Sequence, residues 1–306
     1  FSAGMPLSSR LRFRHRITPP FDDARDYRGK DPTPPVGGAA PEKSARNPVV
    51  RPGALRYPPL METETVLILA GLMLAAAALY ASVGHAGASA YLGIMALAGV
   101  APDVMRPTAL TLNVIVAAIA SWRFVRAGWF SWPVLWPFLA TAAPFAFVGG
   151  MVHLPGDYYR PLVGIVLLFA AFRFLFPERT RPAAEDVRPP RALALLAGAA
   201  IGFLSGLTGV GGGIFLSPLL IAFAWADTRK VAGVAAVFIL VNSLAALGGN
   251  LAAVARLPAE TPYLAAAVVV GAFIGTAFSL GVATRPFLLR ANGAVLAIAG
   301  AKLIFL

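Results

Sequence analysis

The sequence predicts an all-α polytopic membrane protein, and three observations support this fold class. Hydrophobic residues make up 58% of the chain and charged residues only 13%, and the mean hydropathy is +0.72. Apolar segments long enough to cross a hydrocarbon core of about 30 Å follow one another from about residue 64 to the C-terminus. A glycine-rich break occurs twice inside these segments. We expect about eight transmembrane helices in two homologous four-helix repeats, each with a Gly-rich broken or re-entrant helix.

Residues 1–60 differ from the rest of the chain. They contain eleven Lys or Arg, five Asp or Glu and eleven Pro, without apolar periodicity, which predicts a disordered basic Pro-rich tail. Two interpretations of this tail stay open. Its basic residues are suited to binding anionic lipid headgroups. Alternatively, Met61 stands directly before the apolar run and resembles a translation start, so the tail would lie upstream of the true start.

The remaining chain is divided into a first transmembrane repeat at 61–176, a linker at 177–191 and a second repeat at 192–306. The expected spans lie near 64–81, 105–123, 131–152, 158–176, 192–208, 230–253, 262–283 and 286–305. A short apolar arm follows each break, near 88–100 and 213–225. An offset of about 124 to 125 residues places Gly84 on Gly209 and Asp103 on Asp227, and this repeated order of features indicates duplication.

The first apolar stretch, 64–100, would be about 55 Å long as one helix, so it must break or fold back. If the arm after each break crosses the membrane, the repeats are parallel, and if it re-enters, they are inverted; both alternatives stay open. With eight crossings, Arg229 and Lys230 fall on the side opposite the linker. The distribution of basic residues then slightly favours a cytoplasmic linker and tail.

The two breaks are Ser82–Ser89 and Thr208–Gly213. At each break the following arm begins with backbone N–H groups that have no partner within the helix, and these groups with the helix dipole form a local anion site. Glycine permits positive φ and close approach of a ligand to the backbone. The predicted substrate-binding residues are Gly84, His85, Gly87, Ser89, Ser205, Thr208, Gly209, Gly211, Gly212, Gly213 and Asn242.

Each polar candidate also has a structural interpretation. Small hydroxyl residues let membrane helices pack closely, and for Ser89 this explanation is as good as a role in lining the substrate site. Ser205 and Thr208 flank the glycine run, which favours a role in lining the site. His85 is interpreted either as a proton carrier or anion donor, or as a structural histidine. Arg106 and Lys230, just after the two acidic turns, form either an anion-attracting vestibule or a pair of snorkelling side chains.

The residue types also limit the chemistry. The chain has no cysteine, which excludes disulfides and thiolate metal sites. No Asp or Glu lies well inside any predicted span, which argues against a carboxylate proton relay. We expect no catalytic residue, no metal and no cofactor. The expected partners are a small anionic substrate and the lipid bilayer, without nucleic acid, and no oligomeric state is predicted.

The run Gly206-Leu-Thr-Gly-Val-Gly-Gly-Gly-Ile-Phe-Leu-Ser-Pro-Leu-Leu220, followed by a turn and a small-residue span, resembles the TauE/SafE sulfite exporter family of membrane permeases. The first half carries a degraded copy of this motif at Gly84–Ser89. The resemblance covers about residues 64–306. It implies a two-repeat transporter for sulfite, sulfonates or related organic anions, acting outward as a multi-pass protein of the cell membrane, here taken as the bacterial inner membrane.

We therefore predict a permease that exports a small anion by alternating access around the two breaks. Three alternatives were weighed. A phosphate-binding loop is excluded because no Lys-Ser/Thr follows Gly213. An intramembrane serine protease would use Ser89 with His85 or His153 as its base, but the second break has no matching histidine. An anion channel would share the site but would not saturate.

Overall fold

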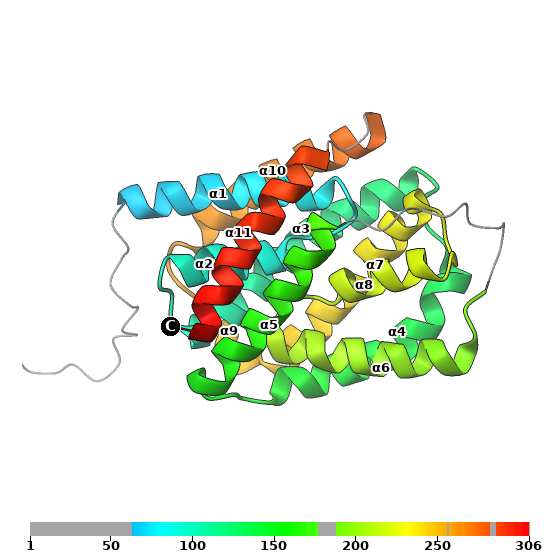
Figure 1. Ribbon diagram of the computed structural model, residues 1–306, viewed down its shortest axis with the longest axis horizontal. Coiled ribbons are helices and arrows are strands. Elements are labelled where there is room, and N and C mark those ends of the chain that lie inside the picture. Colours follow the sequence, from blue (N-terminus) through cyan, green and yellow to red (C-terminus); the bar gives the residue numbers. More distant parts are fainter. Residues whose placement is uncertain (1–62, 177–187, 256, 282–285, 306) are drawn as a thin grey trace, which may run out of the picture. The chain divides into compact units, whose positions relative to one another are not determined.

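The computed structural model describes residues 63–176, 188–255, 257–281 and 286–305. The predicted tail at 1–60 lies outside the described residues, as does most of the predicted linker. The described chain is helical, and the helices are α1 (Thr63–Ala81), α2 (Ala88–Leu97), α3 (Pro102–Arg126), α4 (Trp132–Met151), α5 (Gly156–Leu175), α6 (Arg191–Thr208), α7 (Gly213–Ala222), α8 (Thr228–Gly249), α9 (Leu251–Val254), α10 (Thr261–Gly281) and α11 (Pro286–Phe305) (Figure 1).

Seven of the described helices are long and apolar enough to cross a membrane, namely α1, α3, α4, α5, α6, α8 and α10. In α11 the apolar part, Gly293–Phe305, is shorter. Many large apolar side chains on these helices are exposed, for example Leu196 at 72% and Ile298 at 63%, as expected for surfaces that face lipid. The predicted all-α polytopic membrane fold is confirmed.

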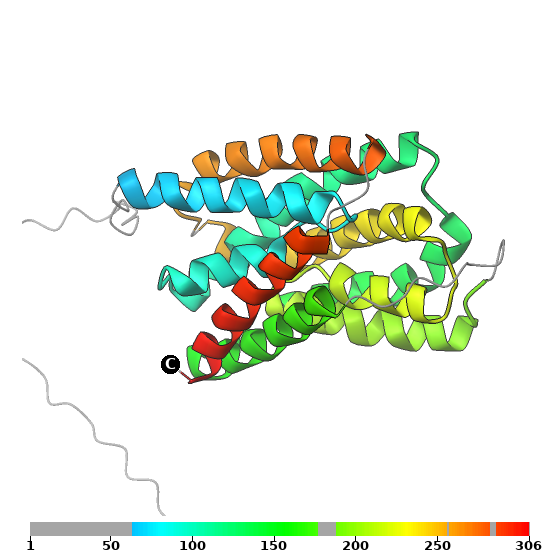
Figure 2. The same ribbon diagram turned by 45° about the horizontal axis from the view of Figure 1, so that its top comes forward.

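The first break reverses the chain. Helix α1 runs parallel to α10, because Gly271 packs on Leu74 and Gly275 packs on Ala78. Helix α2 then returns toward the end at which α1 begins, and it packs on α1 and α3 (Figures 1 and 2). Near its own end, the carbonyl of Leu97 accepts a hydrogen bond of 2.9 Å from Lys302 at the end of α11. The arm after the first break is therefore re-entrant.

The second break also reverses the chain, and it enters the bundle from the opposite end. Helix α6 runs parallel to α4, and α7 returns toward the end at which α6 begins, where Asp227 caps α8. One Asp227 carboxylate oxygen accepts the backbone N–H groups of Arg229 and Lys230, both at 2.9 Å, so this acidic turn is a helix cap. Because α7 does not cross the membrane, α8 begins at the same end of the bundle as α6.

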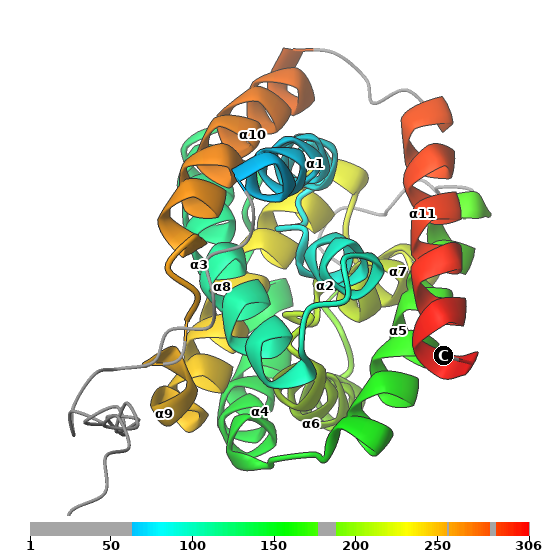
Figure 3. The same cartoon turned by 90° about the vertical axis from the view of Figure 1, so that its left-hand side faces the viewer.

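Glycines set how closely the parallel pairs approach. A Cβ added at Gly198, Gly202 or Gly206 of α6 would overlap backbone carbonyls of α4. Gly271 and Gly275 meet α1 in the same way. Such small residues at four-residue spacing let membrane helices pack backbone to backbone. Figure 3 shows the two pairs, α4 with α6 and α1 with α10, on opposite sides of the central helices α3 and α8.

Helices α3 and α8 cross the centre of the bundle in opposite directions. The start of α8 meets the segment after α3, where the Arg229 guanidinium lies 5.5 Å from the Trp129 ring. The end of α8 meets the start of α3, since Asn250 and Arg106 line one pocket. Arg106 and Lys230 therefore lie at opposite ends of the bundle.

The two ends differ strongly in charge. One end, which we call the arginine-rich end, carries eight of the described basic residues and one acidic residue; these are Arg123, Arg126, Arg173, Arg188, Arg191, Arg229, Lys230 and Arg290, with Asp227. The other end, which we call the opposite end, carries Arg106, Arg160 and Lys302 with Glu64, Asp103, Asp157 and Glu260. The five tryptophans, Trp122, Trp129, Trp132, Trp136 and Trp225, also lie toward the arginine-rich end. Basic residues accumulate on the cytoplasmic side of membrane proteins.

This asymmetry predicts that the arginine-rich end faces the cytoplasm. The chain has no cysteine, so Thr228→Cys at that end and Ala98→Cys at the opposite end each introduce a single, exposed thiol. In intact cells a membrane-impermeant maleimide should label the Ala98→Cys variant at once. It should label the Thr228→Cys variant only after permeabilisation, and the reverse pattern would contradict this orientation.

Candidate functional site

The first break satisfies its own polar groups. The Tyr80 and Ser89 hydroxyls lie 2.8 Å apart, and the Tyr91 hydroxyl donates to the carbonyl of Ala86 at 2.7 Å. The N–H of Ala88, the first residue of α2, donates to Oδ1 of Asn113 at 3.2 Å. The N-terminus of α2 is thus capped by a side chain from α3.

The second break is built from glycines in left-handed conformations. Gly209, Gly211 and Gly212 have φ values of 86°, 83° and 83°. A Cβ at Gly211 would also overlap Nδ2 of Asn113, and one at Gly212 would lie 3.2 Å from Nδ2 of Asn242. Both the backbone conformation and the approach of the two amides therefore require glycine here.

The two breaks meet at the centre of the bundle. A Cβ at Gly213, the first residue of α7, would overlap Ile239 of α8 and lie 3.5 Å from Cδ2 of His85. Nδ2 of Asn113 donates to the Ser243 hydroxyl of α8 at 2.9 Å, so one amide connects α2, α3 and α8. The predicted residues of the first break are thus brought beside those of the second.

Asn113 was missed at the sequence level, although a signal was present. It is an amide halfway along a 25-residue apolar helix, and Asn242 is a second amide inside the 22-residue helix α8. Polar side chains at membrane depth are expensive and mark functional or packing positions.

Polar atoms around the second break are left without partners. Asn242 is fully buried, and neither its amide nitrogen nor its carbonyl oxygen has a hydrogen-bond partner. The hydroxyls of Ser205, in the last turn of α6, and Ser217, in α7, are also buried without partners. Thr208 is satisfied, because its hydroxyl donates to the carbonyl of Leu204 at 2.8 Å. An unpaired buried polar group costs about 1–3 kcal/mol, so a ligand that bonds to these atoms would recover that cost.

The two predicted vestibule residues are not brought together. Arg106 is buried and donates to the carbonyls of Gly149, Gly150 and Val152 at 2.7–2.8 Å, which terminates α4. Lys230 lies in the first turn of α8 at the arginine-rich end.

A pocket of about 230 Å³ opens beside Arg106 at the opposite end, and Asp103, His153, Tyr159 and Asn250 also line it. Two of its walls touch the second break. The Tyr159 hydroxyl donates to the carbonyl of Thr208 at 2.9 Å, and a Cβ at Gly209 would lie 3.1 Å from Cγ of Arg106. This pocket therefore borders the second break at the opposite end of the bundle.

The described side chains at the meeting point offer hydrogen-bonding groups without a carboxylate, lysine or arginine. His85 is the one ionisable side chain within the two breaks, and its Nδ1 lies 3.3 Å from the carbonyl of Val83. Among the described residues, no group of three His, Cys, Asp or Glu side chains is placed to hold a metal ion. The arrangement is suited to a ligand that accepts hydrogen bonds.

Comparison with known proteins assigns the family. The family model described as Sulfite exporter TauE/SafE matches residues 68–303. The chain belongs to the TauE/SafE sulfite exporter family. A probable membrane transporter protein, y4hK, of Sinorhizobium fredii is 37% identical over 249 residues, which cover 80% of this chain and all of that protein. No solved structure matches the chain.

Family membership confirms two predictions made from the sequence. This TauE/SafE protein is a multi-pass protein of the cell membrane and a transporter rather than an enzyme. Its partners include a small-molecule substrate and membrane lipid.

The different bonding of the two amides predicts different effects on stability. Asn113→Ala would leave the N–H of Ala88 and the hydroxyl of Ser243 without a partner, so we expect the free energy of unfolding in detergent to fall by about 1–3 kcal/mol. Asn242→Ala removes an equally buried amide of the same size but breaks no hydrogen bond, and it should cost clearly less. Equal losses in the two variants would contradict this assignment.

Proposed function

We propose that this protein is a permease that exports a small anion, such as sulfite, a sulfonate or a related organic anion, with its binding site where the two breaks meet. The observation that carries the proposal is the buried Asn242 amide, which has no partner and lies beside the glycine-lined N-terminus of α7. Family membership supports transport, and the name of the family includes sulfite.

The geometry favours an anion for electrostatic reasons. Helices α2 and α7 both begin at the centre of the bundle, and helix N-termini carry partial positive charge and free N–H groups. Broken helices of this kind bind anionic groups in other transporters. No lysine or arginine is needed at the site, so a bound anion would be held by neutral dipoles and released without breaking an ion pair.

The two halves of the site are unequal, which points to the second break as the main binding element. In the first break Asn113 already occupies the N-terminus of α2. In the second break Asn242, Ser205 and Ser217 have unpaired polar atoms. We assign Asn242 as a direct ligand of the anion through its amide nitrogen, and Asn113 as a fixed support.

The arrangement of the helices supports alternating access. The two halves show the same order of elements, with α1 to α3 corresponding to α6 to α8, and the corresponding helices α3 and α8 run in opposite directions. The packing pairs also exchange between halves, since α4 packs on α6 and α10 packs on α1. We propose an inverted repeat, which lets the two halves rock about a fixed central site.

In this scheme the 230 Å³ pocket is the extracytoplasmic vestibule, which follows from the predicted cytoplasmic orientation of the arginine-rich end. An interior-negative potential favours anion exit by about 2.3 kcal/mol per charge per 100 mV. Export of a sulfite-like dianion therefore needs no proton relay.

Anion flux in proteoliposomes tests the proposal. We expect saturable sulfite or sulfonate flux that rises when an imposed potential favours anion movement from the arginine-rich end to the opposite end. Asn242→Ala should lower this flux roughly 10-fold to 100-fold, as expected for loss of a hydrogen bond to a charged ligand. Ser121→Ala, which removes another buried and unpartnered hydroxyl, on α3, should keep wild-type flux.

Two outcomes would contradict the proposal. Absence of flux for sulfite, sulfonates and carboxylates in the folded wild-type protein would contradict anion transport. Full flux in the Asn242→Ala variant would show that the transported anion does not bind at the second break. An ohmic current without saturation would instead favour an anion channel.

A further inference from the structure

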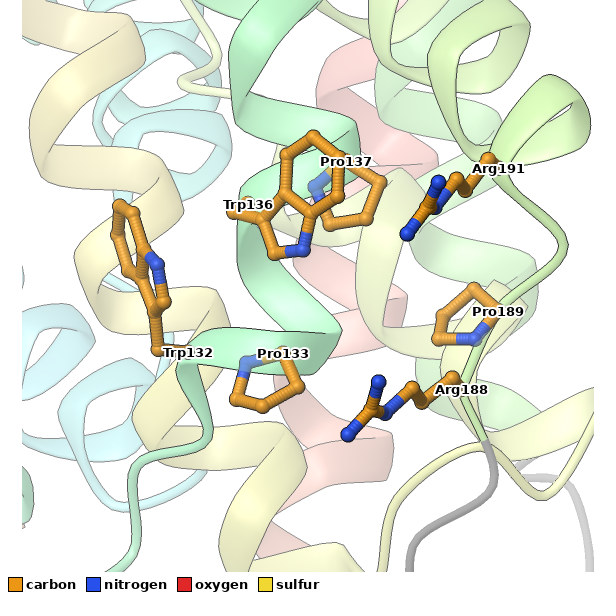
Figure 4. Close-up of a pocket in the computed structure, with 7 residues that line it drawn as sticks. All are labelled: Trp132, Pro133, Trp136, Pro137, Arg188, Pro189 and Arg191. Atoms are coloured by element: carbon orange, nitrogen blue, oxygen red, sulfur yellow. The ribbon is translucent and has the colours of Figure 1, made fainter.

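A second pocket, of about 270 Å³, lies at the arginine-rich end, away from the breaks. Its walls come from the first turns of α4, with Trp132 and Trp136, and from the segment that leads into α6, with Arg188 and Arg191 (Figure 4). Helix α6 begins at Arg191 and reaches the second break about 27 Å away, at its other end. This pocket is therefore separate from the proposed transport site.

The lining of this pocket is cationic and aromatic. Figure 4 shows both guanidinium groups reaching from the α6 side toward α4. The Arg191 guanidinium lies 5.9 Å from the Trp136 ring centroid, and none of the described Asp or Glu residues lines the pocket. Both arginines are exposed, and neither has an ion-pair partner within the part of the chain that the structure describes. Among the described residues, the pocket thus presents two positive charges without an acidic partner.

The surroundings place this pocket at a membrane surface. Trp132 and Trp136 are 56% and 37% exposed, and exposed tryptophans typically lie at the headgroup level of a bilayer. The pocket volume is many times that needed by one water molecule, so the phosphate of a lipid and part of the rest of its headgroup have room to enter.

We propose that this pocket binds the phosphate of an anionic phospholipid, such as phosphatidylglycerol, from the cytoplasmic leaflet. Guanidinium groups match phosphate oxygens with paired hydrogen bonds. The first N–H groups of α6 add the positive end of a helix dipole beside them. Basic pockets between membrane helices on the cytoplasmic side bind phospholipid headgroups in this way.

A lipid fits this pocket better than a soluble anion for two reasons. The walls combine charge with the indole faces of Trp132 and Trp136, which suit the glycerol and upper acyl region of a lipid. The bound headgroup would also contact both α4 and α6, which pack against each other along their length. The lipid would therefore hold together a helix pair that belongs to two different halves of the protein.

Native mass spectrometry of the full chain tests this site. The protein is transferred from micelles containing equal phosphatidylglycerol and phosphatidylcholine, and retained lipid is counted. We expect the wild type to retain phosphatidylglycerol selectively. Arg188→Gln/Arg191→Gln should bind it about 30-fold more weakly, because each basic residue near an anionic lipid contributes about fivefold.

The matched control is Arg123→Gln/Arg126→Gln. This pair removes two arginines from the same end, including one that lies 4.8 Å from the Trp122 ring, but neither lines the pocket. It should retain phosphatidylglycerol like the wild type. Equal retention by the wild type and the Arg188/Arg191 variant, or an equal loss in the control, would overturn the proposal.

A competition arm separates the lipid from a soluble anion. Millimolar inorganic phosphate should leave the retained phosphatidylglycerol unchanged, and displacement by phosphate would overturn the lipid assignment in favour of a free-anion site. Sulfite flux of the Asn242→Ala variant is read separately, so failure of the lipid site and failure of the transport site are distinguishable.

Discussion

Two chain reversals inside the bilayer impose the constraint on which this structure depends. Each leaves backbone N–H and C=O groups without helical partners, and lipid offers none, so they must be satisfied within the protein or by a ligand. Asn113 satisfies this constraint at the first reversal by capping Ala88. At the second, glycines bring the backbone close to Asn242, whose amide has no partner. The proposed binding site is centred on this unpaired amide beside the second reversal.

The surrounding helices position these reversals. Glycines at four-residue spacing let α6 pack directly on the backbone of α4 and α10 on the backbone of α1. This packing sets how far each broken helix extends into the bundle. Arg106 ends α4 by binding two of its carbonyls and that of Val152, the residue after it, and a Cβ added at Gly209 would lie 3.1 Å from the same side chain. The pocket beside Arg106 therefore connects the end of the bundle to the glycine run. Closing this pocket would require Arg106 or α4 to move. Access to the second break therefore depends on the packing of α4 on α6.

The sequence predicted the fold class and both breaks, because apolar length and glycine runs are local signals, and the assignment of residues at the breaks to a substrate stays a prediction. It did not predict the direction of the arms, since a ten-residue apolar helix can continue or return, and only packing against α3 and α8 decides between them. The returning arms also place Arg229 and Lys230 at the end of the bundle where α6 begins. The charge difference between the two ends is therefore strong, whereas the sequence alone indicated a weak one. Asn113 was missed because its role depends on a contact between residues far apart in the chain.

Locating a bound oxyanion tests the central claim most directly. Selenite has the geometry of sulfite and scatters anomalously, so a crystal grown with it would show the anion position without assumptions about flux. The account predicts one selenium peak beside the N-terminus of α7, with an oxygen within hydrogen-bond distance of Nδ2 of Asn242. A peak confined to the pocket beside Arg106, with the Asn242 amide still unpaired, would contradict it.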